Sequence, residues 1–239
     1  MKYAVDLHIH SALSPCADND MTPNNIVNMA VLKGLDAIAV TDHNSGANLR
    51  SVSICAEKNG LLLIPGMEVE TSEEIHIVCL LPDLERMQEF HNRIQSSLPA
   101  ISNRPDIFGR QLIMDENDNV TGEEQQLLLT ASSLSSDEVI ELVRELNGAA
   151  IPAHVDRSSY SMISSLGFIP PELGLKYLEI SKDCDVPEFR FTRPELDRYR
   201  LIKSSDAHYL GDILERETML DLEELSIQAV IRHLAQHVQ

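Results

Sequence analysis

Apolar residues along the chain follow two alternating patterns, short continuous runs and longer stretches with helical spacing. The short runs have the length of strands and cover residues 3–10, 36–41, 61–64, 75–81, 149–154, 176–181 and 201–205. Helical spacing with suitable start and stop residues predicts helices over residues 23–33, 45–59, 83–98, 137–147 and from about 226 to the C-terminus. Repeated alternation of strands and helices is typical of a parallel sheet or barrel.

Residues 99–133 break this alternation. They mix Pro, Gly, Asn and acidic residues with one short apolar run at residues 112–114. The chain has 239 residues, and an α/β barrel commonly takes roughly 200–250 residues as a single domain. We therefore expect one domain over residues 1–239, in which residues 83–133 form an insertion or a divergent stretch.

Polar residues gather where the predicted strands end. His8 and His10 close the first strand, and residues two apart on a strand point to the same face, about 6.5–7 Å apart along it. His76 lies inside the fourth strand, and the other groups are Thr41-Asp42-His43, Gly66-Met67-Glu68, Pro152-Ala153-His154 and Asp206-Ala207-His208. Because the carboxyl ends of barrel strands form the active-site rim, we expect these side chains to converge.

Imidazoles and carboxylates, with almost no thiolate, make up this set. Six of the nine histidines lie on predicted strands or at their ends. Such ligands suit Zn²⁺, Mn²⁺ or Fe²⁺, and Cys16, near two histidines, is a minor candidate for a soft ligand. The set is too large for one ion, so we expect about two to three divalent ions that share a carboxylate. Such sites hydrolyse phosphate esters, because the ions polarise phosphoryl oxygens and lower the pKa of a bridging water.

The net charge limits the partners. The chain carries 19 basic and 38 acidic side chains, a formal charge of −19, which disfavours attraction to long duplex nucleic acid or an anionic membrane. The four cysteines form no Cys-x-x-Cys pair, and no apolar run approaches the ~18 residues of a membrane helix. We expect a cytoplasmic protein that acts on a phosphorylated small molecule, a nucleotide or a short RNA or DNA end. The oligomeric state stays open.

The motifs, in their order along the chain, resemble the PHP (polymerase and histidinol phosphatase) family of metal-dependent phosphoesterases. The matching segments are Asp6-Leu7-His8-Ile9-His10, residues 39–43, Gly66-Met67-Glu68, Glu74-Ile75-His76, Ala153-His154 and residues 205–208. The resemblance implies an α/β fold, a distorted TIM-like (β/α)7 barrel, with a trinuclear metal site.

The resemblance also implies which residues hold each ion. One ion would be held by His8, His10, Glu68 and Asp206; a second, bridged by Glu68, by His76 and His154; and the third by Asp18, His43 and His208. Catalysis would then depend most directly on Glu68, Asp206 and His208. The loop after His10 is longer than usual for the family, so Asp20 remains an alternative to Asp18. Residues 83–133 match the family poorly, and we expect them to decide substrate choice.

Cationic side chains near the strand ends are candidates for binding the substrate. Arg157 comes three residues after His154, and its guanidinium fork matches the geometry of phosphate oxygens. Lys182 and Arg110 are weaker candidates. Asp42 precedes His43, and it either orients a ligand imidazole or caps its strand.

Three functions are compatible with these observations. The first is hydrolysis of a phosphate ester through a metal-bridging hydroxide at a trinuclear site. The second is a metal-dependent amidohydrolase, because such enzymes also begin with a His-x-His pair on a barrel, although Glu68 and the Thr-Asp-His motif fit phosphoesterases better. The third is a non-catalytic, metal-stabilised binding module. The presence of all nine candidate ligands argues against the third.

Overall fold

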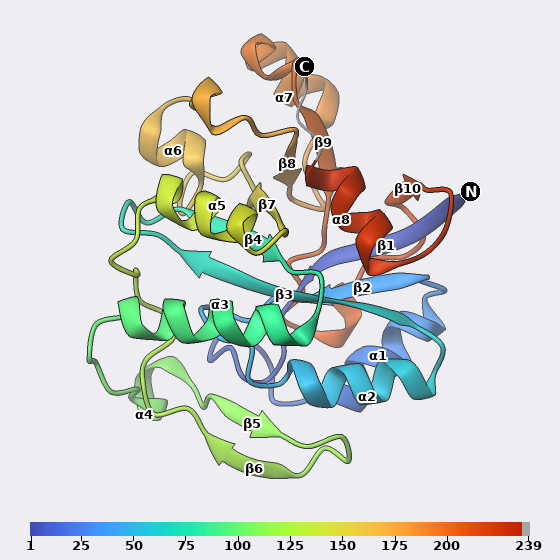
Figure 1. Cartoon of the computed structure of the whole chain (residues 1–239), viewed down its shortest axis with the longest axis vertical. Helices are drawn as coiled ribbons and strands as arrows, with labels where there is room; N and C mark the ends of the chain where they lie inside the picture. The colour runs from blue at the N-terminus through green and yellow to red at the C-terminus, as the bar shows by residue number, and fades with distance from the viewer. Residues whose placement is uncertain (236–239) are drawn as a thin grey trace.

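The computed structural model describes residues 1–235, which form an α/β fold around a curled sheet (Figure 1). The strands are β1 (Lys2–Ile9), β2 (Ala37–Val40), β3 (Leu62–Glu70), β4 (His76–Leu80), β5 (Leu112–Met114), β6 (Val120–Glu123), β7 (Ala149–Pro152), β8 (Tyr177–Ile180), β9 (Arg200–Lys203) and β10 (Met219–Asp221). The α-helices are α1 (Pro23–Leu32), α2 (Leu49–Lys58), α3 (Leu84–Ser97), α4 (Pro105–Phe108), α5 (Ser136–Glu145), α6 (Met162–Leu166), α7 (Val186–Thr192) and α8 (Ile227–Ala235). The last predicted helix ends in residues 236–239, which lie outside the described part.

The main sheet has the strand order β10-β1-β2-β3-β4-β7, and β8 and β9 form a separate parallel pair. This pair lies between the two ends of the curl. The amide of Val155, after β7, donates to Glu179 of β8 at 2.9 Å, and the amide of His10 donates to Ala207, after β9, at 2.9 Å. The expected TIM-like α/β fold is therefore confirmed as a curled half-barrel. Within residues 1–235 the strands do not form the one continuous sheet that a closed (β/α)7 barrel requires.

The sheet is mixed rather than parallel. Strands β1, β2 and β3 are parallel, as expected, but β4 pairs antiparallel with both β3 and β7. The connection between β3 and β4 covers only residues 71–75, with Glu74 at a φ of +58°. Parallel strands need a crossover of about a dozen residues, so this short turn permits only an antiparallel return.

Strand β3 runs to Glu70, well past the predicted end at residue 64. Glu68 therefore sits within a strand, not after one, and it pairs with Val78 of β4. Gly66 makes this extension possible where β3 crosses between its neighbours. A Cβ at residue 66 would lie 2.5 Å from Thr41 Cγ2 and 3.0 Å from the carbonyl oxygen of Val40.

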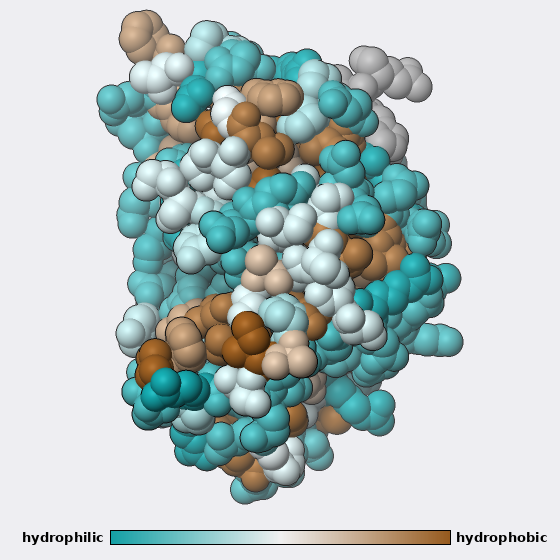
Figure 2. Space-filling model, turned by 90° about the vertical axis from the view of Figure 1, so that its left-hand side faces the viewer, coloured by the Kyte–Doolittle hydropathy of each residue, from teal (hydrophilic) through white to brown (hydrophobic). Residues whose placement is uncertain are grey.

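Two apolar clusters stabilise the sheet. One joins the strands to α1, α2, α3 and α5 through residues such as Ile26, Val52, Phe90 and Val139. The other packs Val230, Ile231 and Leu234 of α8 against Val5, Leu7 and Ile64 of the strands. Polar side chains cover most of the face shown in Figure 2, and apolar groups gather there in a lower band and near the top.

Residues 83–133 fold against the loops that follow β1 and β2. Helix α3 packs on β3, and β5 and β6 form a hairpin beyond it (Figure 1). Asn48 donates to Leu112 O at 3.0 Å and accepts from the amide of Met114 at 2.9 Å. These bonds hold the chain ahead of α2 in a loop, so α2 begins at Leu49 rather than at residue 45. No helix within residues 1–235 has both the length and the apolar character needed to cross a membrane.

Replacement of Gly66 by alanine tests how tightly β3 is packed. Gly66→Ala is expected to lower the free energy of unfolding by about 1–3 kcal/mol, because the new methyl group overpacks Thr41 and Val40. Gly122→Ala is the matched control, since its nearest neighbour would be Ile113 Cδ1 at 3.9 Å. Urea unfolding followed by circular dichroism measures both. Equal stability of the two variants would contradict this packing.

Candidate metal centre

Glu68 is the centre of the site. Its side chain is 1% exposed, and one oxygen, Oε1, lies 2.9 Å from His76 Nδ1, 3.2 Å from His154 Nε2 and 3.3 Å from His8 Nε2. The other oxygen, Oε2, lies 3.0 Å from His43 Nδ1 and 3.5 Å from His10 Nε2. One buried carboxylate therefore contacts imidazoles from β1, β4 and the loops after β1, β2 and β7.

Asp206 supplies a second carboxylate to the same place. Its Oδ1 lies 3.0 Å from His10 Nε2 and 3.4 Å from His8 Nε2, and its Oδ2 lies 2.5 Å from Arg157 Nη1. The backbone here is strained: Asp206 has a φ of +50°, and His154 one of +32°. Strain of this kind in residues other than glycine is concentrated at functional sites.

His8 and His10 are held so that their Nε2 atoms face each other at 3.1 Å. His8 Nδ1 lies 2.9 Å from Glu179 Oε1, which can only accept while it is ionised. His10 Nδ1 lies 3.0 Å from Ser14 Oγ, whose own proton goes to Asp42 at 2.7 Å. Both Nδ1 atoms therefore carry the proton in the neutral rings, and two Nε2 lone pairs meet across the site.

The pKa values follow from this crowding. Burial lowers the pKa of His8, but the carboxylates around it, Glu179 foremost, raise it well above its usual range. Burial and the imidazoles of His43 and His208 hold the pKa of His10 well below its usual range. The two facing rings therefore differ: the surroundings of His8 favour its protonated form, and those of His10 favour its neutral form. A metal ion satisfies both lone pairs at once, because neutral imidazole is the form that binds metal.

The two carboxylates remain ionised. Burial raises the pKa of Glu68, but the surrounding imidazoles, His76 foremost, bring it well below its usual range. The pKa of Asp206 is likewise lowered despite burial, by the charge of His8 and the hydrogen bond with His10. The site therefore places ionised carboxylate oxygens beside imidazole nitrogens, the donor types preferred by Zn²⁺, Mn²⁺ and Fe²⁺.

Two buried atoms of the site have no hydrogen-bond partner, Glu68 Oε2 and His154 Nδ1. Buried polar atoms are almost always paired, so an unpartnered carboxylate oxygen among imidazoles fits a site for cations. Three groups of potential ligand atoms lie within 4.8 Å of one another: His8, His10 and Glu68; His43, Glu68 and His76; and His10, His43 and His208. The donor set thus fits the expected metal ions.

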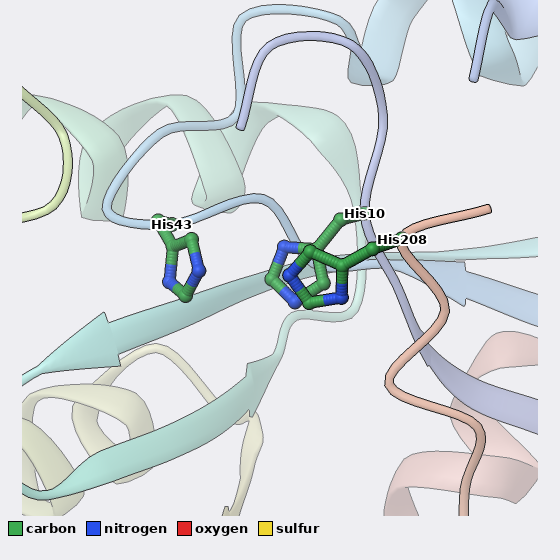
Figure 3. Close-up of side chains that lie close together, drawn as sticks. All are labelled: His10, His43 and His208. Carbon is green, nitrogen blue, oxygen red and sulfur yellow. The ribbon is translucent and has the colours of Figure 1, made fainter. Parts of the chain in front are cut away.

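The third group is drawn in Figure 3. His10 comes from the end of β1, His43 from the loop after β2 and His208 from the loop after β9, and their rings converge although they are far apart in sequence. Cys16 joins them, because its Sγ lies 3.2 Å from His208 Nε2. Burial raises the pKa of the Cys16 thiol, but its hydrogen bonds with His208 and His43 have the larger effect and lower this pKa to about 7.

The backbone of the predicted loop ligand, Asp18, contacts His208, but its carboxylate is not among the three groups of potential ligands found within residues 1–235. The Asp18 amide donates to His208 O at 2.9 Å, whereas its carboxylate accepts from the Asp20 amide at 2.8 Å. Both acids are exposed, and neither belongs to the three groups found within residues 1–235. The structure brings the other eight predicted ligands together.

The three predicted substrate-binding cations differ in position. Arg157 lines a cavity of about 130 Å³ beside Glu68, Asp206 and the imidazoles. Lys182 instead pairs with Asp212 at 2.5 Å, and Arg110 pairs with Glu123 on the β5–β6 hairpin. Neither lines this cavity, so the structure does not bring them to the site.

Sequence reasoning missed Glu179, whereas the hydroxyl of Tyr160, in the Ser-rich turn after Arg157, could already be expected to line the pocket. Glu179 orients His8, and its signal was a single acid inside the apolar run of residues 177–180. Tyr160 lines the cavity, stacks on His76 with ring centres 4.8 Å apart and is 48% exposed. Asp42 was predicted to orient a ligand ring or cap its strand, and it contacts His10 indirectly, through Ser14.

Several known proteins resemble this chain in sequence or in fold. An uncharacterized protein of Methanocaldococcus jannaschii is 26% identical over 224 residues, which cover 92% of this chain and 23% of that protein. The 5′-3′ exoribonuclease Rnm of Salmonella typhimurium is 30% identical over 181 residues, 71% of this chain and 58% of that enzyme. This chain thus spans only part of both relatives.

Solved structures with the same fold include the lesion-specific endonuclease of Pyrococcus furiosus, with a TM-score of 0.70 and 20% identity over 98% of this chain and 56% of that one. A structure of Endonuclease Q with a 27-mer duplex that carries an abasic lesion has a TM-score of 0.68, at 20% identity over 97% of this chain and 56% of that one. At this identity the likeness establishes the fold.

A family model decides the relationship, because it spans most of the segment that carries the metal-ligand motifs. The model described as PHP domain matches residues 6–168, from the start of the His8 and His10 motif to beyond His154. The match confirms the resemblance that the motifs indicated. The chain therefore belongs to the PHP domain family.

Proposed function

We propose that this protein is a metal-dependent phosphoesterase. The observation that carries the proposal is Glu68, whose two oxygens reach two different groups of imidazoles and could join two ions. The ions would polarise the phosphoryl oxygens, supply the nucleophile from water and stabilise the leaving oxygen. The exoribonuclease relative, which by its name cleaves phosphate esters, supports the same reaction class.

The proposed ion sites follow the family resemblance. His8, His10, Glu68 and Asp206 would hold the first ion, and His76 and His154 would complete the second with Glu68. His43 and His208 would belong to the third. Glu179 and Ser14 keep the Nε2 atoms of His8 and His10 free for binding, since each engages the opposite ring nitrogen.

Arg157 is proposed to bind the phosphoryl group. Its Nη1 contacts Asp206 Oδ2, and its Nε donates to Ser181 Oγ at 3.2 Å, so the guanidinium is held at the edge of the cavity. These two bonds use two of the five N–H donors of the guanidinium, and the other three are available for planar, paired hydrogen bonds to phosphate oxygens. Asp206 would thus both bind an ion and position the arginine.

The size of the cavity restricts what enters it. About 130 Å³ accommodates a phosphoryl group, whereas sites that enclose a whole small molecule measure about 300–1,000 Å³. The rest of the substrate would lie outside, across the exposed ring of Tyr160. A nucleotide or the end of a short oligonucleotide fits this arrangement, because a base can stack on an aromatic ring. A small phosphomonoester also fits.

The net charge of −19 favours short substrates over long duplexes. The fold itself does not exclude a duplex, since Endonuclease Q has been crystallised with one. We propose that residues 83–133 influence substrate choice, because they fix the loops that carry His10 and His43. The bonds of Asn44 Nδ2 to Leu128 O and Thr130 O, at 2.8 and 3.0 Å, show how closely they are joined.

Removal of individual ligands tests the proposed reaction. His8→Ala and Asp206→Ala are each expected to abolish hydrolysis of nucleoside mono- and bisphosphates, short RNA and p-nitrophenyl phosphate in the presence of Mn²⁺, Zn²⁺ or Fe²⁺. His233→Gln is the control, because His233 contacts Tyr177, outside the site. Near-full activity of either ligand variant would refute the assignment. Turnover of amides or lactones by the wild type, without phosphoesterase activity, would favour the amidohydrolase alternative, and no turnover at all would favour a binding module.

Replacement of the cations tests which of them binds phosphate. Arg157→Ala is expected to lower kcat/KM by about tenfold to a hundredfold, since a hydrogen bond to a charged group contributes about 1.5–3 kcal/mol. Arg157→Lys should restore only part of the loss, because lysine lacks the planar fork. Arg110→Ala and Lys182→Ala should change kcat/KM little, as both cations are engaged in ion pairs. A larger loss in either of these than in Arg157→Ala would contradict the assignment.

A further inference from the structure

The loop between His10 and α1 presents a thiol, not a carboxylate, to the third group of ligands. Asp18 is exposed, and its Oδ1 accepts a hydrogen bond from the Asp20 amide at 2.8 Å. Asp20 is exposed as well, in the turn ahead of α1. By contrast, Cys16 Sγ lies 3.2 Å from His208 Nε2, and the thiol also interacts with His43.

The hydrogen bond at Nδ1 of His208 determines whether its other ring nitrogen, Nε2, has a free lone pair. Its Nδ1 lies 2.9 Å from the backbone oxygen of Asp206, and a carbonyl oxygen can only accept a hydrogen bond. Nδ1 therefore carries the proton, and the lone pair of Nε2 points at Cys16 Sγ. This lone pair can accept the thiol proton, or it can bind the same ion as the thiolate.

A buried carboxylate oxygen, Glu68 Oε2, also lies beside this third group, next to His43 and His10. Glu68 Oε2 has no hydrogen-bond partner, although its side chain is 1% exposed and His43 Nδ1 lies 3.0 Å away. This observation is independent of the cysteine. A buried anionic oxygen without a hydrogen-bond partner beside two imidazoles fits a binding position for a cation.

The segment that carries Cys16 is held in place from behind. Its turn is closed by the Ser14 and Ala17 amides, which donate to Ser11 O and Ser14 O at 3.0 and 2.9 Å. Gly109 packs directly against Pro15, the residue before Cys16, since a Cβ at residue 109 would lie 2.1 Å from the carbonyl oxygen of Pro15. The position of the thiol is therefore fixed by the fold.

We propose that Cys16, together with His43 and His208, holds the third metal ion, in place of Asp18. Glu68 Oε2 would complete the set. This proposal rests on the proposed function in one respect only, because both assume that metal ions bind at this site. A thiolate makes this position softer than the other two, so it favours Zn²⁺ over Mn²⁺ while the sites built on carboxylates accept either.

Cobalt spectroscopy tests the proposal without any assay of hydrolysis. The metal-free full chain is titrated with Co²⁺, and the near-ultraviolet thiolate-to-cobalt charge-transfer band is recorded. The wild type is expected to show this band, Cys16→Ser is expected to lose it, and Cys184→Ser, the matched control, is expected to keep it. The proposal is overturned if the wild type shows no band, or if Cys16→Ser retains it. Asp18→Asn should leave the band unchanged.

Alkylation of the unaltered protein provides a second measurement that needs no variant. Cys16 is exposed, whereas Cys55 and Cys79 are buried. Iodoacetamide followed by peptide mass spectrometry is expected to modify Cys16 readily in the metal-free chain and at least about tenfold more slowly in the Zn²⁺-loaded chain. Equal rates with and without Zn²⁺ would overturn the proposal. A chain that shows the band and the protection but hydrolyses no phosphate ester would refute the proposed function and leave this inference standing.

Discussion

Two imidazole nitrogens that face each other at 3.1 Å are the constraint on which the rest of the site depends. Glu179 and Ser14 engage the opposite nitrogens of His8 and His10, so neither ring can turn a proton toward the other while both are neutral. Positive charge has to lie between them. The buried carboxylates of Glu68 and Asp206 stabilise that charge, and together with the two imidazoles they are the groups that we propose to hold a cation.

The fold brings these groups together by curling one mixed sheet. The short turn between β3 and β4 returns the chain beside Glu68, so His76 meets it from the neighbouring strand. The pair β8–β9 then carries Glu179 and the segment with Asp206 and His208 to the end of β1, where Ala207 pairs with Ile9 beyond the part of β1 that pairs with β10. Residues 83–133 support the loops that hold His10, Cys16 and His43. Each ligand thus depends on contacts between segments that are distant in sequence.

The alternation of apolar runs and helices predicted most elements, and the position of polar residues at strand ends predicted that His8, His43, His154 and Asp206 would converge. Strand direction was harder to predict, because β4 has the same apolar pattern in either direction, and only the length of the 71–75 turn decides it. Glu179 was not predicted as a site residue because it is a single acid within the apolar run of residues 177–180. The sequence alone could not show that the Cys16 thiol contacts His208 while the Asp18 carboxylate accepts from the Asp20 amide, because both contacts depend on how the loop folds.

The central claim is that this arrangement of imidazoles and carboxylates is a site for several metal ions. The most direct measurement is the metal content of the purified chain, by inductively coupled plasma mass spectrometry, after reconstitution with Mn²⁺, Zn²⁺ or Fe²⁺ and removal of free ions. The account predicts about two to three equivalents of transition metal per chain. Fewer than about one equivalent with every metal would contradict it, because one ion could not satisfy both groups of imidazoles that Glu68 joins.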